Sequence, residues 1–404
     1  MCQVNSICIY IGLDKMSAGG RSLGHPCTRV SGVGLALHSP TRAFYHMRSM
    51  SSVSRLIYCY SKQHVIRSMG CLKRPGITLQ PGLGNSLNRK GGAALRKAGI
   101  VWFRNDLRLH DHEALSRAGA ECTSVLPIYC FDPREYGTLK RKKYGKTGPY
   151  RATFVIDAVR DLRERLRERG SDLVVAVGKP EEVIPMFARK VGASAIYCHT
   201  EVTYEETQVE NRVKQIFVEE SGGIFHSFWT NTLHDVDDVP CGLEKLPQSF
   251  DEFKSTMEGI GPRACVGEQA SLKSTPIGTF ELGEIPSLED LGIAPLESVQ
   301  GDEGSSFPSC RGGESEGLRQ LKKFISSIST EKNAVASFSG NIAPWLASGC
   351  LSPRKMMESV MDFDGGTDQA FKWIRFELLW RDFFRMLTRR HADVVLLKCA
   401  ASVS

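Results

Sequence analysis

The stretch that decides the fold is Ile100-Val-Trp-Phe-Arg-Asn-Asp-Leu-Arg108, an apolar run that changes abruptly into a charged turn. The run Ile100–Phe103 is short and rich in β-branched and aromatic residues, which predicts a buried strand. Arg104 and Asp106 follow where that strand ends. Because α/β domains place ligands or domain contacts at the carboxyl edge of the sheet, we expect Arg104 and Asp106 to pair there across the turn.

The alternation of apolar run and amphipathic helix repeats along the chain. Helices are predicted where apolar residues recur at helical spacing, as in Val155, Val159 and Leu162, and where Pro180 is followed by two glutamates. Strands are predicted at Ile100–Phe103, Val125–Phe131, Leu173–Val177, Ala195–Tyr197 and Gly223–Trp229. Short strands separated by such helices require right-handed crossovers. Residues 98–240 are therefore predicted to form an α/β domain with a doubly wound, parallel, five-stranded sheet.

Residues 1–97 differ from the rest of the chain in charge. They hold 14 Lys and Arg but one acidic residue, Asp14, and they are rich in Ser, Gly and Arg. That composition is typical of a chloroplast or mitochondrial transit segment; an upstream extension of the coding sequence is the alternative. The other residues carry 38 basic against 44 acidic side chains. The net charge of +7 therefore belongs to this leader, and it does not predict affinity for nucleic acid.

The composition changes again after the α/β domain. Residues 241–316 are rich in Gly, Ser, Pro and Glu, as in Gly301-Asp-Glu-Gly-Ser-Ser306, which predicts a connector that is partly disordered. Helical patterns return at Leu318–Ile328 and are strong at Phe371–Met386. A second, all-helical domain is therefore expected from residue 317 to residue 404. No run of about 18 apolar residues occurs, so no membrane span is predicted.

Several short motifs fail the tests for known chemistry. Gly145-Lys-Thr147 is not a phosphate-binding loop, because Lys140 stands where that loop needs a glycine. No nicotinamide fingerprint is present. The 13 cysteines include no CxxC pair, so free thiols are expected. No catalytic residue is assigned from these patterns.

Two clusters of polar residues have a structural explanation. His110 and His112 would point apart on a helix, so no metal site is predicted, and Asp111 or His112 is expected to cap the following helix. Glu201, Glu205 and Glu206 are interpreted as the start of a helix, where carboxylates favour the positive end of the dipole; catalytic carboxylates are the alternative.

Longer motifs carry a resemblance. Trp102-Phe-Arg-Asn-Asp-Leu-Arg108, followed by His110-Asp-His-Glu-Ala-Leu115, resembles the opening motif of cryptochromes and photolyases. The further matches, in order, are Gly148-Pro-Tyr-Arg-Ala-Thr-Phe154, Glu201-Val-Thr-Tyr-Glu-Glu206, Gly312-Gly-Glu-Ser-Glu-Gly-Leu318, Pro344-Trp-Leu-Ala-Ser-Gly-Cys-Leu-Ser-Pro-Arg354 and Phe376-Glu-Leu-Leu-Trp-Arg-Asp-Phe-Phe-Arg385. Residues 98–387 are thus identified as similar to this family, and most similar to its DASH cryptochromes.

The resemblance implies a blue-light flavoprotein. Members of the family hold FAD in the helical domain, and many hold 5,10-methenyltetrahydrofolate as an antenna on the α/β domain. Photolyases transfer an electron from reduced FAD to a cyclobutane pyrimidine dimer, and the DASH group favours single-stranded DNA. A dimer flipped from a single strand costs less unstacking than one in a duplex, which rationalises that preference. DNA is therefore the expected partner, and no protein partner is indicated.

The resemblance also assigns site residues. Ser339, Gly340 and Asn341 fall on the loop that contacts the FAD phosphates, and Arg381 falls on a basic residue near the flavin. Glu205 falls on a position that binds the antenna folate. The lesion pocket of the family corresponds to Glu377 and Trp380, which with Arg381 lie on one helical face at i, i+3 and i+4. The alternative for that helix is an aromatic core with an internal ion pair.

This chain departs from the family pattern in two places. The loop Ser339-Gly-Asn-Ile-Ala-Pro344 lacks one hydroxyl and one basic residue of the family motif. The residues after Arg385 have no counterpart there, so the helical FAD-binding domain is expected to be incomplete and apolar surface to be exposed at Phe371, Phe376, Leu379 and Phe383. Two hypotheses of function follow: a DASH-like light-dependent flavoprotein, or a catalytically inactive member that retains only the α/β antenna domain. A third hypothesis is an unrelated nucleotide-binding α/β protein.

Overall fold

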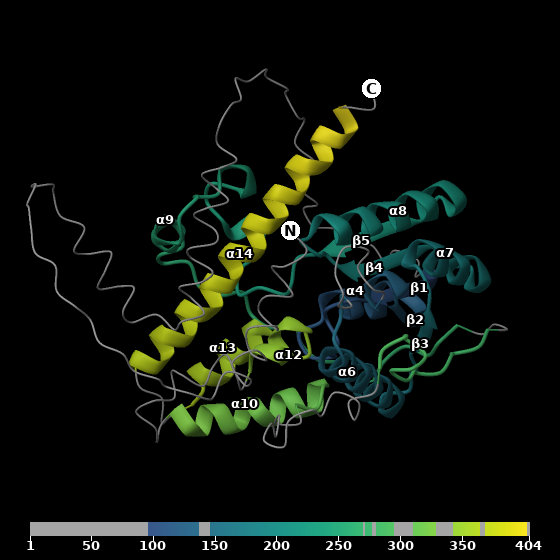
Figure 1. Cartoon of the computed structure of the whole chain (residues 1–404), viewed down its shortest axis with the longest axis horizontal. Helices are drawn as coiled ribbons and strands as arrows, with labels where there is room; N and C mark the ends of the chain where they lie inside the picture. Colours follow the sequence, from purple (N-terminus) through teal and green to yellow (C-terminus); the bar gives the residue numbers. More distant parts are fainter. Residues whose placement is uncertain are drawn as a thin grey trace, which may run out of the picture. The chain divides into compact units, whose positions relative to one another are not determined.

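The structure is a computed structural model that describes residues 96–136, 146–269, 271–276, 280–294, 310–328, 342–363 and 368–401. The predicted leader lies outside the described residues, apart from Arg96 and Lys97, which begin the first strand. The α/β part and the helices that follow it belong to one compact unit (Figure 1).

Five parallel strands form one sheet in the order β3-β2-β1-β4-β5, which confirms the predicted α/β fold. The strands are β1 (Arg96–Phe103), β2 (Cys122–Phe131), β3 (Val174–Val177), β4 (Ala195–His199) and β5 (Ile224–Phe228). The chain first builds outward from β1 to β3 and then crosses back to β4 on the other side of β1. The carboxyl ends of β1 and β4 therefore form the point at which the direction of winding reverses, where open α/β sheets bind their ligands.

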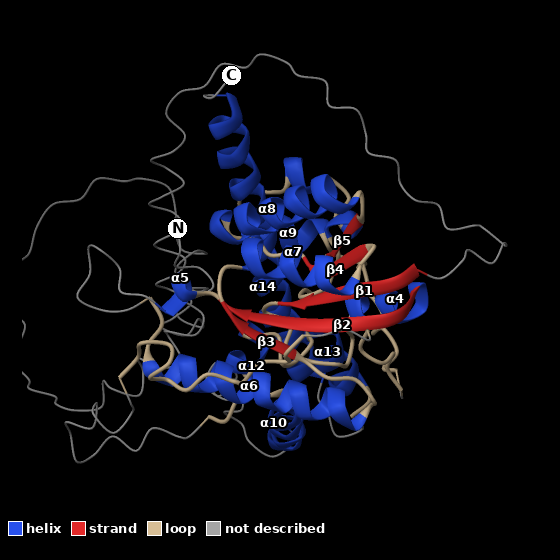
Figure 2. Ribbon diagram, turned by 90° about the vertical axis from the view of Figure 1, so that its right-hand side faces the viewer, coloured by secondary structure: helices blue, strands red, loops and turns tan. Residues whose placement is uncertain are grey.

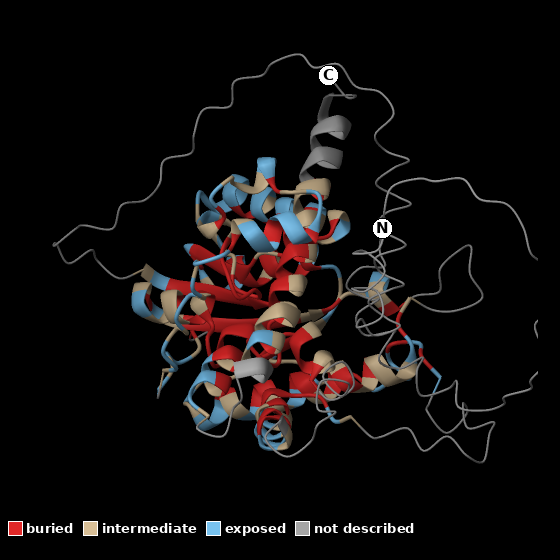
Figure 3. Ribbon diagram, turned by 90° about the vertical axis from the view of Figure 1, so that its left-hand side faces the viewer, coloured by how far each residue is buried: buried red, intermediate tan, exposed pale blue. Residues whose placement is uncertain are grey.

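The central strand β1 shows why the sheet is buried on both faces. Ile100 and Trp102 face a hydrophobic cluster formed with helices α7 (Pro180–Val191) and α8 (Tyr204–Ser221). Val101 and Phe103 face the opposite cluster, which includes α4 (Glu113–Glu121) and α6 (Pro149–Glu168). The sheet lies between these two layers of helices in Figure 2, and Figure 3 shows that the buried residues are concentrated there.

Local capping sets where the helices begin. The side chain of His112 accepts a hydrogen bond from Leu115 N at the start of α4, as expected for one of the two candidate caps. Thr203 and Glu206 form a capping box at the start of α8, so Glu206 has the helix-start role predicted for its cluster. The short elements are α5 (Pro133–Tyr136), two 3-10 helices, η1 (Val236–Asp238) and η2 (Leu243–Lys245), and α9 (Phe250–Thr256).

In the described ranges, four helices follow the connector: α10 (Glu314–Ile328), α12 (Ala343–Ala347), α13 (Pro353–Met361) and α14 (Asp368–Ala401). They share the hydrophobic cluster on the α6 side of the sheet through residues such as Phe324, Trp345 and Met356. The predicted domain boundaries at 240 and 317 stay predictions. None of the helices in the described ranges is long and apolar enough to cross a membrane.

The expected exposure of α14 is wrong for two of its four residues. Leu379 and Phe383 are buried in a third cluster, together with Phe250 and Phe253 of α9. Phe371 and Phe376 are half-buried. The physical reason is that residues 236–260, which the sequence analysis placed mostly in the connector, lie over one apolar face of α14.

Described parts of the connector, residues 260–269, 271–276 and 280–294, pack against the α/β part as a strap. Leu272 N donates to Arg169 O at 3.0 Å, and Val125 N donates to Ser274 O at 3.1 Å. At the edge of the sheet, Val175 N of β3 donates to Leu282 O at 2.7 Å. The strap therefore continues the hydrogen bonding of the sheet beyond β3.

The turn after β1 joins the sheet to the later helices. The guanidinium of Arg108 donates to Asn231 Oδ1 and to Gly349 O, both at 2.8 Å. Glu314, the first residue of α10, accepts from Leu109 N at 2.8 Å and from His110 N at 3.1 Å. These buried contacts hold segments together that are more than a hundred residues apart in the sequence.

We predict that Gly349→Ala destabilises the chain by about 2–4 kcal/mol, as expected for strained backbone combined with overpacking. Gly349 has φ of +69°, and an added Cβ would lie 1.9 Å from Asn105 O, a backbone atom. Urea unfolding measures the change. Gly261→Ala is the matched control, because a Cβ at that exposed glycine meets nothing within 4 Å. Equal stability of the two variants would contradict the tight approach of the α12–α13 turn to the end of β1.

Candidate functional site

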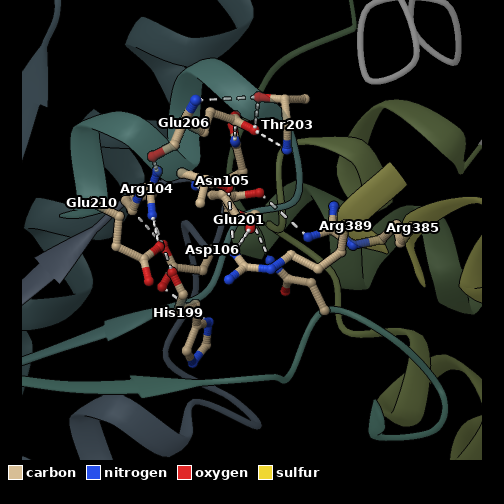
Figure 4. Close-up of polar contacts among 12 residues, drawn as sticks. Arg104, Asn105, Asp106, His199, Glu201, Thr203, Glu206, Glu210, Arg385 and Arg389 are labelled. Carbon is tan, nitrogen blue, oxygen red and sulfur yellow. Dashed lines mark hydrogen bonds and ion pairs between the residues drawn. The ribbon is translucent and has the colours of Figure 1, made fainter. Parts of the chain in front are cut away.

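Charged side chains gather where β1 and β4 end (Figure 4). Arg104 donates to Glu210 Oε2 of α8 at 2.6 Å and to Glu206 O at 3.0 Å. The expected side-chain pair of Arg104 with Asp106 is therefore wrong: only the backbone N of Arg104 donates to Asp106 Oδ1, at 2.5 Å. The long side chain of Arg104 reaches α8, where the carboxylate of Glu210 is buried. Asp106 contacts histidines instead.

Two buried histidines lie next to the carboxylate of Asp106. His112 Nε2 lies 2.9 Å from Asp106 Oδ2, and His199 Nδ1 lies 3.0 Å from the same oxygen but without the alignment of a hydrogen bond. Burial lowers the pKa of His199 to about 3, so that imidazole is neutral. Burial alone would raise the pKa of the Asp106 carboxyl, but its contact with His112 helps to hold that pKa well below its usual range.

The ligand atoms of Asp106, His112 and His199 lie within 4.8 Å of one another, which raises the question of a metal ion. Two observations do not fit a metal ion at this position. His112 Nδ1 accepts from Leu115 N, so Nε2 carries the proton of the neutral ring and cannot be a ligand. The two rings also stack, with centroids 4.2 Å apart and planes 23° apart. Lone pairs in nearly parallel planes do not converge on one ion.

Glu201 links this edge of the sheet to α14. Its Oε2 lies 3.3 Å from Arg385 Nη2, and its Oε1 accepts from Asn105 N at 3.3 Å. Arg389, one turn further along α14, donates to Glu201 O at 3.1 Å and to Thr207 Oγ1 at 3.2 Å. Of the glutamate cluster Glu201, Glu205 and Glu206, Glu201 is thus a buried contact between segments and not part of the helix start.

The predicted lesion-pocket residues lie on α14. Glu377 is half-buried and makes no hydrogen bond or ion pair with any residue of the described ranges; desolvation raises its pKa to about 6. The Trp380 ring lies 4.5 Å from the ring of Phe250 and 5.2 Å from that of Phe384, measured between centroids. The aromatic part of the alternative interpretation of this helix is therefore present, but the internal ion pair is not.

Arg381, predicted to lie near a flavin, contacts two backbone carbonyls. Its Nη1 donates to Asn231 O, and its Nη2 donates to Leu346 O at 3.0 Å. The next residue, Asp382, accepts from Leu233 N at 3.0 Å and from His234 N at 2.9 Å. Arg381 and Asp382 together fix α14 to the loop that follows β5.

Of the other predicted site residues, some lie outside the described residues and one lies within them. Ser339, Gly340 and Asn341 lie outside the described residues. Glu205 is exposed in the first turn of α8. The structure therefore brings Glu377, Trp380 and Arg381 together on α14 and leaves Glu205 on a separate element.

Sequence reasoning missed the residues that dock α14. Arg385 and Arg389 were assigned no role, and Asp382 was quoted only within a motif. A signal was available: Arg381, Arg385 and Arg389 recur every fourth residue, which places three guanidinium groups on one face of a helix. Such a stripe, next to an otherwise apolar helix, indicates a partner rich in carboxylates and carbonyls.

Comparisons with known proteins agree on the class of protein that this geometry resembles. The family model described as DNA photolyase matches residues 99–266. A relative from Arabidopsis thaliana, Blue-light photoreceptor PHR2, is 43% identical over 324 residues, covering 74% of this chain and 71% of the relative. Cryptochrome DASH from Gloeobacter violaceus is 38% identical over 312 residues, covering 74% of this chain and 60% of the relative.

A solved structure supports the same fold. The cryptochrome of Synechocystis matches with a TM-score of 0.65 and 32% identity, covering 74% of this chain and 62% of that structure. The chain thus spans less than two thirds of the length of this structure and of the Gloeobacter relative. Similar proteins from Solanum lycopersicum and Arabidopsis thaliana carry the name Cryptochrome DASH, chloroplastic/mitochondrial.

We predict that Glu377→Gln stabilises the chain at pH 8 and leaves its stability nearly unchanged at pH 4.5. A carboxyl whose pKa is raised to about 6 in the folded state opposes folding above that pH, and most of this penalty is relieved at pH 4.5, where the folded state is protonated and the unfolded state is about half protonated. The expected gain is about 1–2 kcal/mol at pH 8, measured by urea unfolding at both pH values. Glu168→Gln, at an exposed carboxyl on α6, is the control. A loss of stability at pH 8 would mean that Glu377 is paired in the folded chain.

Proposed function

This chain belongs to the DNA photolyase and cryptochrome family, and from that premise we propose that it is a DASH-like blue-light flavoprotein that holds FAD weakly and binds DNA through α14. The observation that carries the proposal is the α14 face, on which Glu377, a half-buried carboxyl without a partner in the described ranges, lies one turn from Trp380. A polar group left unpaired in this way favours a ligand that supplies the missing hydrogen bond.

The described residues fit only part of a flavin site. A pyrophosphate needs several donors, and Arg381, the cation assigned to the flavin by motif, is directed at the carbonyls of Asn231 and Leu346. FAD, when bound, would supply light absorption and the transferred electron. The chain's own residues would position what it acts on, and the two carbonyl contacts of Arg381 support weak retention of FAD.

DNA is the proposed partner, and a pyrimidine dimer in a single strand is the proposed ligand. Trp380 offers a half-buried indole on which an extruded base can stack. Below about pH 6 the Glu377 carboxyl is protonated and donates a hydrogen bond; above that pH it only accepts. The 5,10-methenyltetrahydrofolate antenna is proposed near Glu205, which is exposed in the first turn of α8.

The cofactor proposal is tested on the purified full-length chain. We expect visible flavin absorbance well below one FAD per chain, because the loop Ser339-Gly-Asn-Ile-Ala-Pro344 lacks one hydroxyl and one basic residue of the family motif. Denaturation and chromatography of the released chromophores would identify FAD and any folate. A stoichiometric yellow protein would contradict weak binding, and a chain that retains folate but no FAD after incubation with both would favour the catalytically inactive alternative.

The DNA proposal is tested by fluorescence anisotropy with a single-stranded oligonucleotide that carries one cyclobutane pyrimidine dimer. We expect Trp380→Leu to weaken binding about 10-fold, because it removes one base-stacking surface. Phe383→Leu is the matched control: Phe383 belongs to the same aromatic cluster but is only 3% exposed. Equal loss in both variants would show a general effect on α14 and not a contact with DNA.

We also propose that residues 1–97 direct the chain to the chloroplast or the mitochondrion, on the evidence of their basic, Ser-rich composition. A fusion of these residues to a fluorescent protein should accumulate in one of the two organelles. Replacing the 14 Lys and Arg by Gln should leave the fusion in the cytosol. A fusion that is cytosolic without any replacement would contradict the proposal.

A further inference from the structure

The ends of β1 and β4 are filled by charged side chains of the chain itself (Figure 4). Open α/β sheets commonly bind a ligand at this point, where the winding reverses. Here Arg385 and Arg389 of α14 lie against Glu201 and Thr207 instead. The contact is therefore an interface within the chain, and its stability depends on how well its charges are matched.

The charges at this interface do not balance. The α/β part contributes four carboxylates, from Asp106, Glu201, Glu206 and Glu210, and one guanidinium, from Arg104; α14 contributes two guanidinium groups, from Arg385 and Arg389. His199 adds no charge, because its pKa is about 3. With every acid ionised, the interface carries a net charge of about −1 in a region of low dielectric.

Glu201 is the carboxylate with the weakest partners. Glu210 receives Arg104 at 2.6 Å, and Glu206 accepts from Thr203 Oγ1 at 2.6 Å. Both contacts to the Glu201 carboxylate are 3.3 Å long, and that side chain is fully buried. Arg385 Nε is also buried and finds no hydrogen-bond partner in the described part of the chain.

We propose that docking of α14 onto the ends of β1 and β4 takes up one proton at Glu201, so that the contact tightens as the pH falls from 8 to 5. The groups that face Glu201 are Arg104, Asn105 and Asp106 from the turn after β1, Glu206 from α8, and Arg385 and Arg389 from α14. Protonation removes the excess negative charge and leaves both arginines with carbonyl, carboxyl and hydroxyl oxygens to contact.

The direction in which stability changes with pH distinguishes proton uptake at Glu201 from an ordinary ion pair. Desolvation, together with Glu206, raises the pKa of Glu201 to about 6, so the folded state binds a proton that the unfolded state releases at the same pH. Stability is then gained as the pH falls through about 6. A carboxylate stabilised mainly by Arg385 would have a lowered pKa, and the chain would lose stability in acid.

The test compares the full-length wild type with Glu201→Gln by urea unfolding at half-unit steps from pH 8 to pH 5. We expect the folding equilibrium constant of the wild type, divided by that of the variant, to rise about tenfold over this range. Glu164→Gln, at an exposed carboxyl of α6, is the matched control and should run parallel to the wild type. A flat ratio, or one that falls in acid, would overturn the proposal.

A second variant keeps the test decisive if Glu201→Gln does not fold. Arg385→Gln removes one positive charge and leaves the interface with a net charge of about −2, so proton uptake should begin at a higher pH than in the wild type. Amide hydrogen exchange of Asp382–Arg389, corrected for the intrinsic pH dependence, reports the docking of α14 directly. Protection that is equal at pH 5 and pH 8 in both proteins would overturn the proposal.

Discussion

The buried guanidinium of Arg108 is the constraint on which the described structure depends. It is among the largest fully buried side chains, and none of its hydrogen bonds to the described residues goes to a carboxylate. Its acceptors are the carbonyl oxygens of His110, Asp111 and Gly349 and the amide oxygen of Asn231. Burial lowers the pKa of Arg108 from its usual value, which shows how much the charge relies on these oxygens. If one acceptor were displaced, a charge would be left partly unsatisfied in the interior.

That constraint explains why the helices after the connector follow the ends of the strands. Gly349 reaches Arg108 because the turn after α12 passes close to the backbone of Asn105. Ser352, at the start of α13, donates from its hydroxyl to Asp111 Oδ2 and from its backbone N to His110 Nε2. The other ring nitrogen of His110 contacts Glu314. The turn after β1 is thus a junction of the sheet, α10 and α13. The longest helix, α14, extends the same edge through Asp382, Arg385 and Arg389.

The sequence alone predicted the parts of the fold that depend on local pattern. Alternating apolar runs and amphipathic helices predicted five parallel strands, and the start of α4 was predicted because His112 needs only the backbone of Leu115. Long-range partners could not be predicted. Arg104 could reach Asp106 two residues away, yet it binds Glu210, since the register of α8 on the sheet decides which carboxylate is near. The motif residues Glu377, Trp380 and Arg381 were predicted to share a face, but the carbonyls that bind Arg381 come from elements more than thirty residues distant.

The strap across β3 has a consequence for self-association. A sheet edge with open N–H and C=O groups is a template on which a second chain can add a strand. On β3, Val175 N already donates to Leu282 O. Gly283 approaches Val175 O so closely that an added Cβ would lie 2.0 Å from that oxygen. A deletion through residues 280–283 would open the edge of a strand that is apolar along its whole length, Val174–Val177, and would leave that edge free for edge-to-edge aggregation.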